Sequence, residues 1–209
     1  WPRICAIDPH PRICTVVLYM AICPPQQFMM EANKYDIKVP IDIGLEGEDI
    51  YIVYDEIYQQ EGLLIKDIAD LMKVKEGHDY VLYRLIDNSA NTPDPIIGTS
   101  VREEFEKYGI RTLLADKDVA NRIWRVRGRL QVHTLFVQKS CPNTDWEFRH
   151  YAWDEYKIGK DYKDSKEKPR KKRDHAMDCL GYMCVSSPRY DIPEIYRPLR
   201  KTIDRDTGY

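Results

Sequence analysis

Hydrophobic residues follow two different periods along this chain. Residues 3–8, 13–23 and 49–58 are β-rich runs that predict three consecutive strands. From residue 62 onward, stretches with apolar residues at helical spacing alternate with short apolar runs, giving the order β-β-β-α-β-α-β-α-β-α-α. Three leading strands with short connections predict an antiparallel meander. The sequence therefore predicts an α/β fold, with a mixed sheet flanked by helices.

Several local patterns refine this prediction. Ser100 and Glu103 form a capping-box pattern at the start of a helix, and residues 79–87 are apolar enough for a strand buried on both faces. The breakers Pro24, Pro25, Pro40, Gly44 and Gly47 make 24–48 read as a loop-like insertion. The other predicted elements are helices within 62–75, 99–110, 116–131, 144–156 (aromatic residues inward) and 173–185, and strands within 111–116 and 132–138. We expect one domain over 1–185 and a C-terminal tail over 186–209.

Composition narrows the function classes. The chain has 209 residues and a net charge near −2, so its total charge does not indicate a nucleic-acid binder. Its six cysteines form no CxxC pair, so we expect buried free thiols and no zinc site. There is no GxxxxGK[ST] motif, no apolar run long enough to span a membrane, and no signal peptide. The abrupt start just before an apolar strand reads like a domain cut from a longer chain.

Three acidic residues occupy comparable positions in the predicted elements. Asp8 ends the first strand, Asp87 ends the fourth, and Asp178 lies in the first turns of the last helix. The residues around Asp178 in that helix are otherwise mostly apolar. Asp174 and His175 share a helix face with Asp178 because they precede it by four and three residues. Acids that gather at strand ends repel one another unless a cation joins them, and hard divalent cations prefer oxygen ligands. The pattern therefore predicts a site for two Mg²⁺ or Mn²⁺ ions.

Each of these residues also has a simpler interpretation. A strand-end aspartate is usually a turn or cap residue, and Asp174 taken alone is best read as the N-cap of the last helix. His175 at a helix start is more often a surface or capping group than a ligand. A basic loop is usually only solvated.

A basic run precedes the last helix. From residue 160 to residue 173 the chain has eight Lys or Arg against three acids. We expect part of this run to contact the phosphates of a DNA backbone, which positions DNA without reading its bases. The residues concerned are Lys166, Lys168, Arg170, Lys171, Lys172 and Arg173.

The order of these features resembles the ribonuclease H-like nuclease fold, and local motifs narrow the resemblance. "LIDNSANTP" around Asp87 is similar to a motif of phage terminase large subunits, and "DKDVANRIWRVRGRL" to the helix that follows it there. "FRHYAWDEY" resembles their Tyr-x-Trp segment, and "RDHAMDCLGYM" their Asp-His-x-x-Asp-Ala-x-x-Tyr ending. The resemblance covers roughly residues 4–185 and implies the C-terminal headful-cleavage nuclease domain of a viral DNA-packaging motor.

The resemblance also implies site residues and partners. Asp8, Asp87 and Asp178 would be the metal-binding and catalytic acids. His175 would be a catalytic histidine beside the metals, and Asp174, the acid before it, would also bind metal. The implied substrate is double-stranded DNA, the partners are portal protein and the small terminase subunit, and the location is the host cell cytoplasm, with no membrane. In one departure, Cys179-Leu-Gly181 stands where the family commonly has Ala-Leu-Arg, which removes a potential basic contact.

Two other functions fit the same fold. A Holliday-junction resolvase or a transposase-like nuclease would need structure-selective DNA binding or a partner that recognises DNA ends. A domain without catalysis would serve as a docking module for portal or the small subunit. Retention of all three acids favours the nuclease over the docking module.

Overall fold

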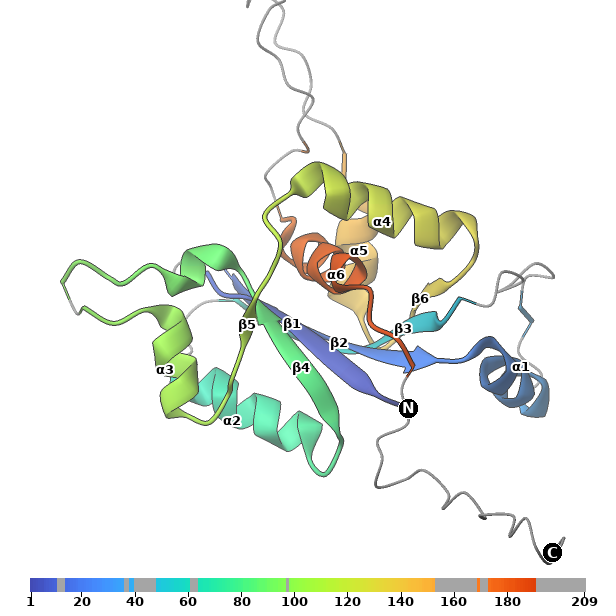
Figure 1. The fold of residues 1–209 in the computed structure, drawn as a ribbon, viewed down its shortest axis with the longest axis horizontal. Coiled ribbons are helices and arrows are strands. Elements are labelled where there is room, and N and C mark those ends of the chain that lie inside the picture. Colours follow the sequence, from blue (N-terminus) through green and yellow to red (C-terminus); the bar gives the residue numbers. More distant parts are fainter. Residues whose placement is uncertain are drawn as a thin grey trace, which may run out of the picture.

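A six-stranded mixed sheet forms the centre of the protein, in the order β5-β4-β1-β2-β3-β6 (Figure 1). The computed structural model describes residues 1–10, 14–35, 38–39, 48–60, 64–96, 98–152, 169 and 173–190. Neighbouring strands β1, β2 and β3 are antiparallel, β4 and β5 extend the sheet parallel to β1, and β6 runs parallel to β3. The strands are β1 Arg3–Asp8, β2 Cys14–Cys23, β3 Ile50–Gln60, β4 Val81–Ile86, β5 Leu113–Leu114 and β6 Leu135–Val137. The predicted mixed sheet, antiparallel and then parallel, is confirmed.

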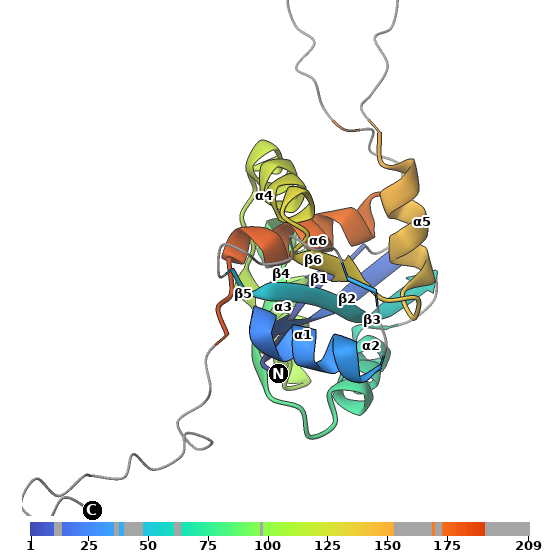
Figure 2. The same ribbon diagram turned by 90° about the vertical axis from the view of Figure 1, so that its right-hand side faces the viewer.

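Helices cover both faces of this sheet. Figures 1 and 2 show α4, α5 and α6 on one face and α2 and α3 on the other. The helices are α1 Pro25–Lys34, α2 Ile65–Glu76, α3 Val101–Lys107, α4 Val119–Gln131, α5 Pro142–His150 and α6 His175–Ser186, with a 3₁₀ turn η1 at Asn88–Asn91. No helix within the described part of the chain is both long and apolar enough to cross a membrane.

Side-chain alternation along the strands divides the core into two halves. On β1, Ile4 and Ala6 face α6, whereas Cys5 and Ile7 face α2 and α3, and all four are fully buried. Helix α6 packs its buried face, which includes Leu180 and Met183, on the first half. Because both faces are covered, the strands read as nearly continuous apolar runs. The free cysteines whose side chains are described are all buried, as expected.

Helix α1 corrects the prediction that residues 24–48 form a loop-like insertion. Pro25 occupies the first helical position, where its missing N–H costs nothing and its fixed φ suits the helix. Phe28 of α1 stacks on Phe136 of β6, with ring centroids 5.2 Å apart, which anchors the helix beside the sheet. Pro25 therefore starts helix α1 instead of breaking the chain into a loop. Part of the predicted insertion between β2 and β3 is therefore helical.

Two further predictions about burial were wrong. Strand β4 is fully buried only at Leu85 and Ile86, because the two-residue β5 pairs with those positions alone and leaves the first half of β4 at an open edge. On α5 the aromatic residues do not face inward, since Trp146 is 42% exposed and Phe148 37%. Thr144 and Glu147 are the buried residues of that helix.

The capping box at Ser100 and Glu103 is confirmed, with both hydrogen bonds present.

Candidate active site

Asp8 and Asp87 lie side by side at the same end of the sheet. Strands β1 and β4 are parallel neighbours in which Ile7 pairs with Ile86, and the Asp87 N–H donates to the carbonyl of Ile7 (3.1 Å). Because side chains alternate along a strand, both acids follow a residue of the opposite face and point toward α6. The predicted convergence of these two strand ends is therefore present.

The start of α6 adds the remaining predicted residues. Asp174 is the N-cap residue, His175 the first residue of the helix, and Asp178 follows one turn later. His175 donates Nδ1–H to Oδ2 of Asp8 (2.7 Å), and both side chains are about 85% buried. This hydrogen bond, followed by the charges of Asp8, Asp174 and Glu147, raises the pKa of His175. The histidine is thus bound to the acid that ends β1.

Asp178 lies in an acidic, partly buried environment. Burial raises its pKa to about 6, against the effect of the Arg122 guanidinium, and the charges of Asp8, Asp174 and Asp87 add to the increase. All four acids are consequently close enough to repel one another. Arg122 from α4 places Nη1 3.0 Å from Oδ1 of Asp178 and is its cationic partner.

Asp87 is held by two donors of different origin. Its Oδ1 accepts from the Ser89 N–H (2.6 Å), and Oδ2 accepts from the hydroxyl of Tyr182 on α6. Burial raises the pKa of Asp87, but these hydrogen bonds, helped by the charge of Arg122, outweigh burial and lower it overall. Asp87 therefore stays ionised and fixed in orientation.

A glutamate from another helix caps α6. Asp174 has the predicted N-cap position, yet its side chain makes no capping hydrogen bond. Glu147 of α5, 1% exposed, supplies Oε2 to the N–H groups of Ala176 (2.7 Å) and Met177 (3.2 Å). The Tyr58 hydroxyl donates to its Oε1 (2.7 Å). The charge of Asp174 contributes to the raised pKa values of both His175 and Asp178.

Sequence reasoning missed several residues around these acids. Arg122, Tyr182 and Glu147 contact or cap the cluster from three helices, and the ring of His10 lies 5.7 Å from that of His175. His10 lies two residues after Asp8 in "DPHP", so its closeness to the strand end could be predicted from the sequence. Arg122 and Glu147 gave no local signal, because their partners lie 56 and 29 residues away in the sequence.

The predicted DNA-contacting residues fall mostly outside the described chain. Lys166, Lys168, Arg170, Lys171 and Lys172 lie outside the described residues. Arg173 is exposed, directly precedes Asp174, and holds its guanidinium 5.3 Å from the centroid of the Trp146 ring.

The chemistry of the donor set fits a hard divalent cation. Four carboxylates approach one another, and oxygen ligands are those that Mg²⁺ and Mn²⁺ prefer. Within the described residues, no three acid, histidine or cysteine side chains are already arranged around one point that would hold a metal. The acids instead have internal partners: His175 for Asp8, Tyr182 for Asp87 and Arg122 for Asp178. A metal would add to or replace some of these contacts.

Comparison with solved structures places this arrangement in a known fold. The large terminase of a thermophilic bacteriophage matches 88% of this chain with a TM-score of 0.60 and 18% identity, and its complex with ADP gives 0.61. The large terminase nuclease domain of phage P22 matches 88% of this chain at a TM-score of 0.62 and 14% identity. The chain has the fold of a large-terminase nuclease domain. This is the ribonuclease H-like fold, as the motifs predicted.

The extent of each match defines what is shared. The chain spans 39% of the length of the thermophilic phage terminase and 80% of the P22 nuclease domain. No family model and no curated protein sequence matches it. At 14–18% identity, the shared property is the fold, and the acids must be judged on their own geometry.

Proposed function

We propose that this chain is a divalent-metal-dependent endonuclease that cuts double-stranded DNA by hydrolysis of phosphodiester bonds. The observation that carries the proposal is the convergence of Asp8, Asp87, Asp174 and Asp178 at one end of the sheet. Their mutual repulsion, expressed in the raised pKa of Asp178, is unfavourable in the absence of a cation and is relieved by one. The terminase nuclease fold supports the same conclusion independently.

The four acids would hold two Mg²⁺ or Mn²⁺ ions. When bound, such a pair of ions supplies an activated water and stabilises the leaving oxygen of a phosphodiester. Asp8 ends the strand next to β4 and is bound by His175, and it would hold these ions together with Asp87 and Asp178. Hydrolysis would leave a 5′ phosphate and a 3′ hydroxyl.

His175 would hold a proton at Nδ1 next to Asp8. The hydrogen bond to Asp8 raises the pKa of His175, which favours the protonated imidazole. We propose that it orients water or carries a proton during hydrolysis. Full activity of a His175→Ala variant would exclude this role.

The biological setting we propose is cleavage of packaged DNA in a phage packaging motor. The chain would act as the headful nuclease of a terminase large subunit, in the host cell cytoplasm, with portal protein and the small subunit as partners. Arg173 and the basic residues before it, Lys166 to Lys172, would contact the DNA backbone. The fold of the P22 nuclease domain supports this setting.

Cleavage of supercoiled plasmid tests the proposed activity. We expect nicking and linearisation with Mn²⁺ or Mg²⁺, no cleavage in EDTA, and loss of at least a hundredfold in rate for Asp87→Asn. Asp145→Asn is the matched control, because Asp145 is an exposed acid on α5 paired with Arg149 away from the cluster. Cleavage restricted to branched DNA would point to a resolvase instead. A folded protein that binds DNA but neither binds metal nor cuts would be a docking module.

A further inference from the structure

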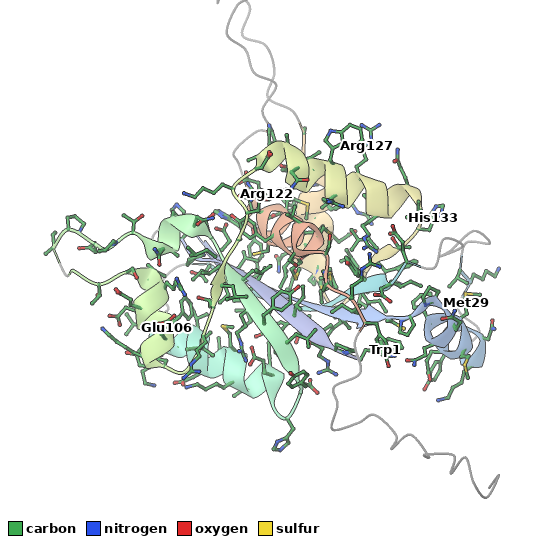
Figure 3. The ribbon with its side chains drawn as sticks, viewed as in Figure 1. Trp1, Met29, Glu106, Arg122, Arg127 and His133 are labelled. Carbon is green, nitrogen blue, oxygen red and sulfur yellow. The ribbon has the colours of Figure 1, made fainter. Side chains whose placement is uncertain are left out.

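Arg122 occupies an unusual position between α4 and α6. The residue is 7% exposed, and its aliphatic stem lies directly on Gly181. A Cβ atom at Gly181 would lie 2.9 Å from Cβ and 3.1 Å from Cδ of Arg122, closer than packed atoms tolerate. Figure 3 shows Arg122 between α4 and α6, whereas Arg127 of the same helix points away from the protein. The glycine therefore makes the space that lets this arginine enter.

The guanidinium of Arg122 contacts two residues of α6 at once. Nη1 is 3.0 Å from Oδ1 of Asp178, and the guanidinium carbon is 4.7 Å from the centroid of the Tyr182 ring. The hydroxyl of Tyr182 in turn donates to Oδ2 of Asp87. A chain of contacts thus runs from Asp178 through Arg122 and Tyr182 to Asp87, behind the acids.

A stabilising ion pair alone does not account for this arrangement. Burying a guanidinium costs free energy that a single carboxylate repays only with good geometry and further hydrogen bonds. Nε and Nη1 of Arg122 are buried and form no well-aligned hydrogen bond within the described residues. Residues that stand behind metal ligands and fix their orientation are a recognised way to tune a metal site. Arg122 has the position of such a residue.

We propose that Arg122, stacked on Tyr182 in the space left by Gly181, is a positioning residue that orients the carboxylates of Asp178 and Asp87 for metal binding. The proposal rests on the proposed function and adds a residue to it. Oδ1 of Asp178 is bound by the guanidinium, which restricts the orientation of that carboxylate.

The sign of the effect on metal affinity separates positioning from simple electrostatics. Removing a positive charge beside a cation site strengthens cation binding if charge is all that matters. If Arg122 positions Asp178 and Asp87, its removal weakens binding instead, by about tenfold, as for other residues that support metal ligands. The two accounts therefore predict opposite changes.

Mn²⁺ titration calorimetry on the 209-residue chain, without DNA, makes this measurement. We expect Arg122→Met to weaken Mn²⁺ binding about tenfold and to lower plasmid cleavage at saturating Mn²⁺. Gly181→Ala keeps every charge but displaces the arginine stem, so it should weaken binding in the same direction. It also serves as the test should Arg122→Met fail to fold. Combined with Tyr182→Phe, Arg122→Met should cost less than the sum of the single effects, because both act on one contact chain.

Arg129→Met is the matched control. Arg129 lies two turns along α4, holds its guanidinium 3.8 Å from the Tyr51 ring centroid and pairs with Glu48, remote from the acids. It should lower stability and leave Mn²⁺ affinity unchanged. Unchanged or tighter Mn²⁺ binding in both Arg122→Met and Gly181→Ala would overturn the positioning role while leaving the nuclease intact. A wild-type chain that neither binds Mn²⁺ nor cuts would instead overturn the proposed function, and the positioning role with it.

Discussion

At the scale of single residues, the candidate site depends on side chains that fix the start of α6. Helix termini leave N–H groups without internal partners, and a buried terminus must have them satisfied. Glu147 does this from α5, at the cost of a buried carboxylate whose pKa is raised by burial. The position of His175 and Asp178 thus depends on a glutamate outside the acidic cluster.

Replacing this glutamate should destabilise the protein. Glu147→Ala leaves the N–H groups of Ala176 and Met177 and the hydroxyl of Tyr58 without their acceptor, for which we expect a loss of about 2–4 kcal/mol. Urea unfolding in EDTA measures it. Glu147→Gln keeps an acceptor oxygen and should lose less. Equal, small effects of both variants would show that the cap contributes little.

His175 predicts a pH dependence of stability. Its pKa is raised above the ordinary value of 6.5, chiefly by the hydrogen bond to Asp8, so the folded protein binds this proton more tightly than the unfolded chain does. The contribution is fully present below about pH 6.5 and is lost as pH rises through the raised pKa. In EDTA, the stability difference between wild type and His175→Gln should therefore shrink as the pH rises above about 6.5. A difference that grows over this range would mean that the imidazole is held neutral.

The residues of this site differ in how far the sequence foretold them. The positions of Asp8, Asp87, Asp174 and Asp178 could be predicted, because strand ends and helix spacing follow from local periodicity. Their partners Arg122 and Glu147 come from helices whose packing on α6 no local pattern specifies. Gly181 illustrates the limit, since only the packed structure shows that its missing side chain makes room for the stem of Arg122.

At the scale of elements, periodicity predicted the sheet and most helices, and its errors have physical causes. Pro25 was interpreted as a helix breaker, but it occupies the first position of α1. On α5, Trp146 faces outward because Glu147 and Thr144 occupy the buried positions of the helix. Helix α4 is the most informative element. Val119, Ile123, Val126 and Leu130 follow helical spacing, and they line a pocket of about 230 Å³ against α6.

The outer face of α4 predicts a further DNA contact. The helix has four arginines and no acid. Trp124 is 71% exposed and directly precedes Arg125. Arg125 and Arg127 are exposed and pair with no acid among the described residues. Arg125→Ala/Arg127→Ala should weaken duplex binding and reduce the slope of log K against log salt by about two. Fluorescence anisotropy at several salt concentrations measures this. Lys66→Ala/Lys73→Ala on α2, across the sheet, is the control. Equal slopes in both double variants would place the DNA elsewhere.

At the scale of the whole molecule, the acidic cluster joins distant parts of the chain. Asp8 lies in β1, Asp87 directly after β4 and Asp178 in α6. These parts of the chain are far apart in the sequence, so the cluster exists only in the folded state. A cation that binds the cluster therefore binds the native protein and not the unfolded chain, apart from weak contacts with single acids. Metal binding and global stability are consequently linked.

Metal-dependent melting tests this linkage without any substrate. At a free Mn²⁺ concentration about a hundred times the dissociation constant, binding should add about 2.7 kcal/mol to the free energy of unfolding. For a chain of this size, that corresponds to a rise of about 5–10 °C in Tm. Asp8→Asn and Asp87→Asn should each lose most of the rise, because each removes a carboxylate from the cluster, whereas Asp145→Asn should keep it. A similar rise in all four proteins would mean that Mn²⁺ stabilises the fold by binding at another surface. The acids would then lie close together without forming a metal site.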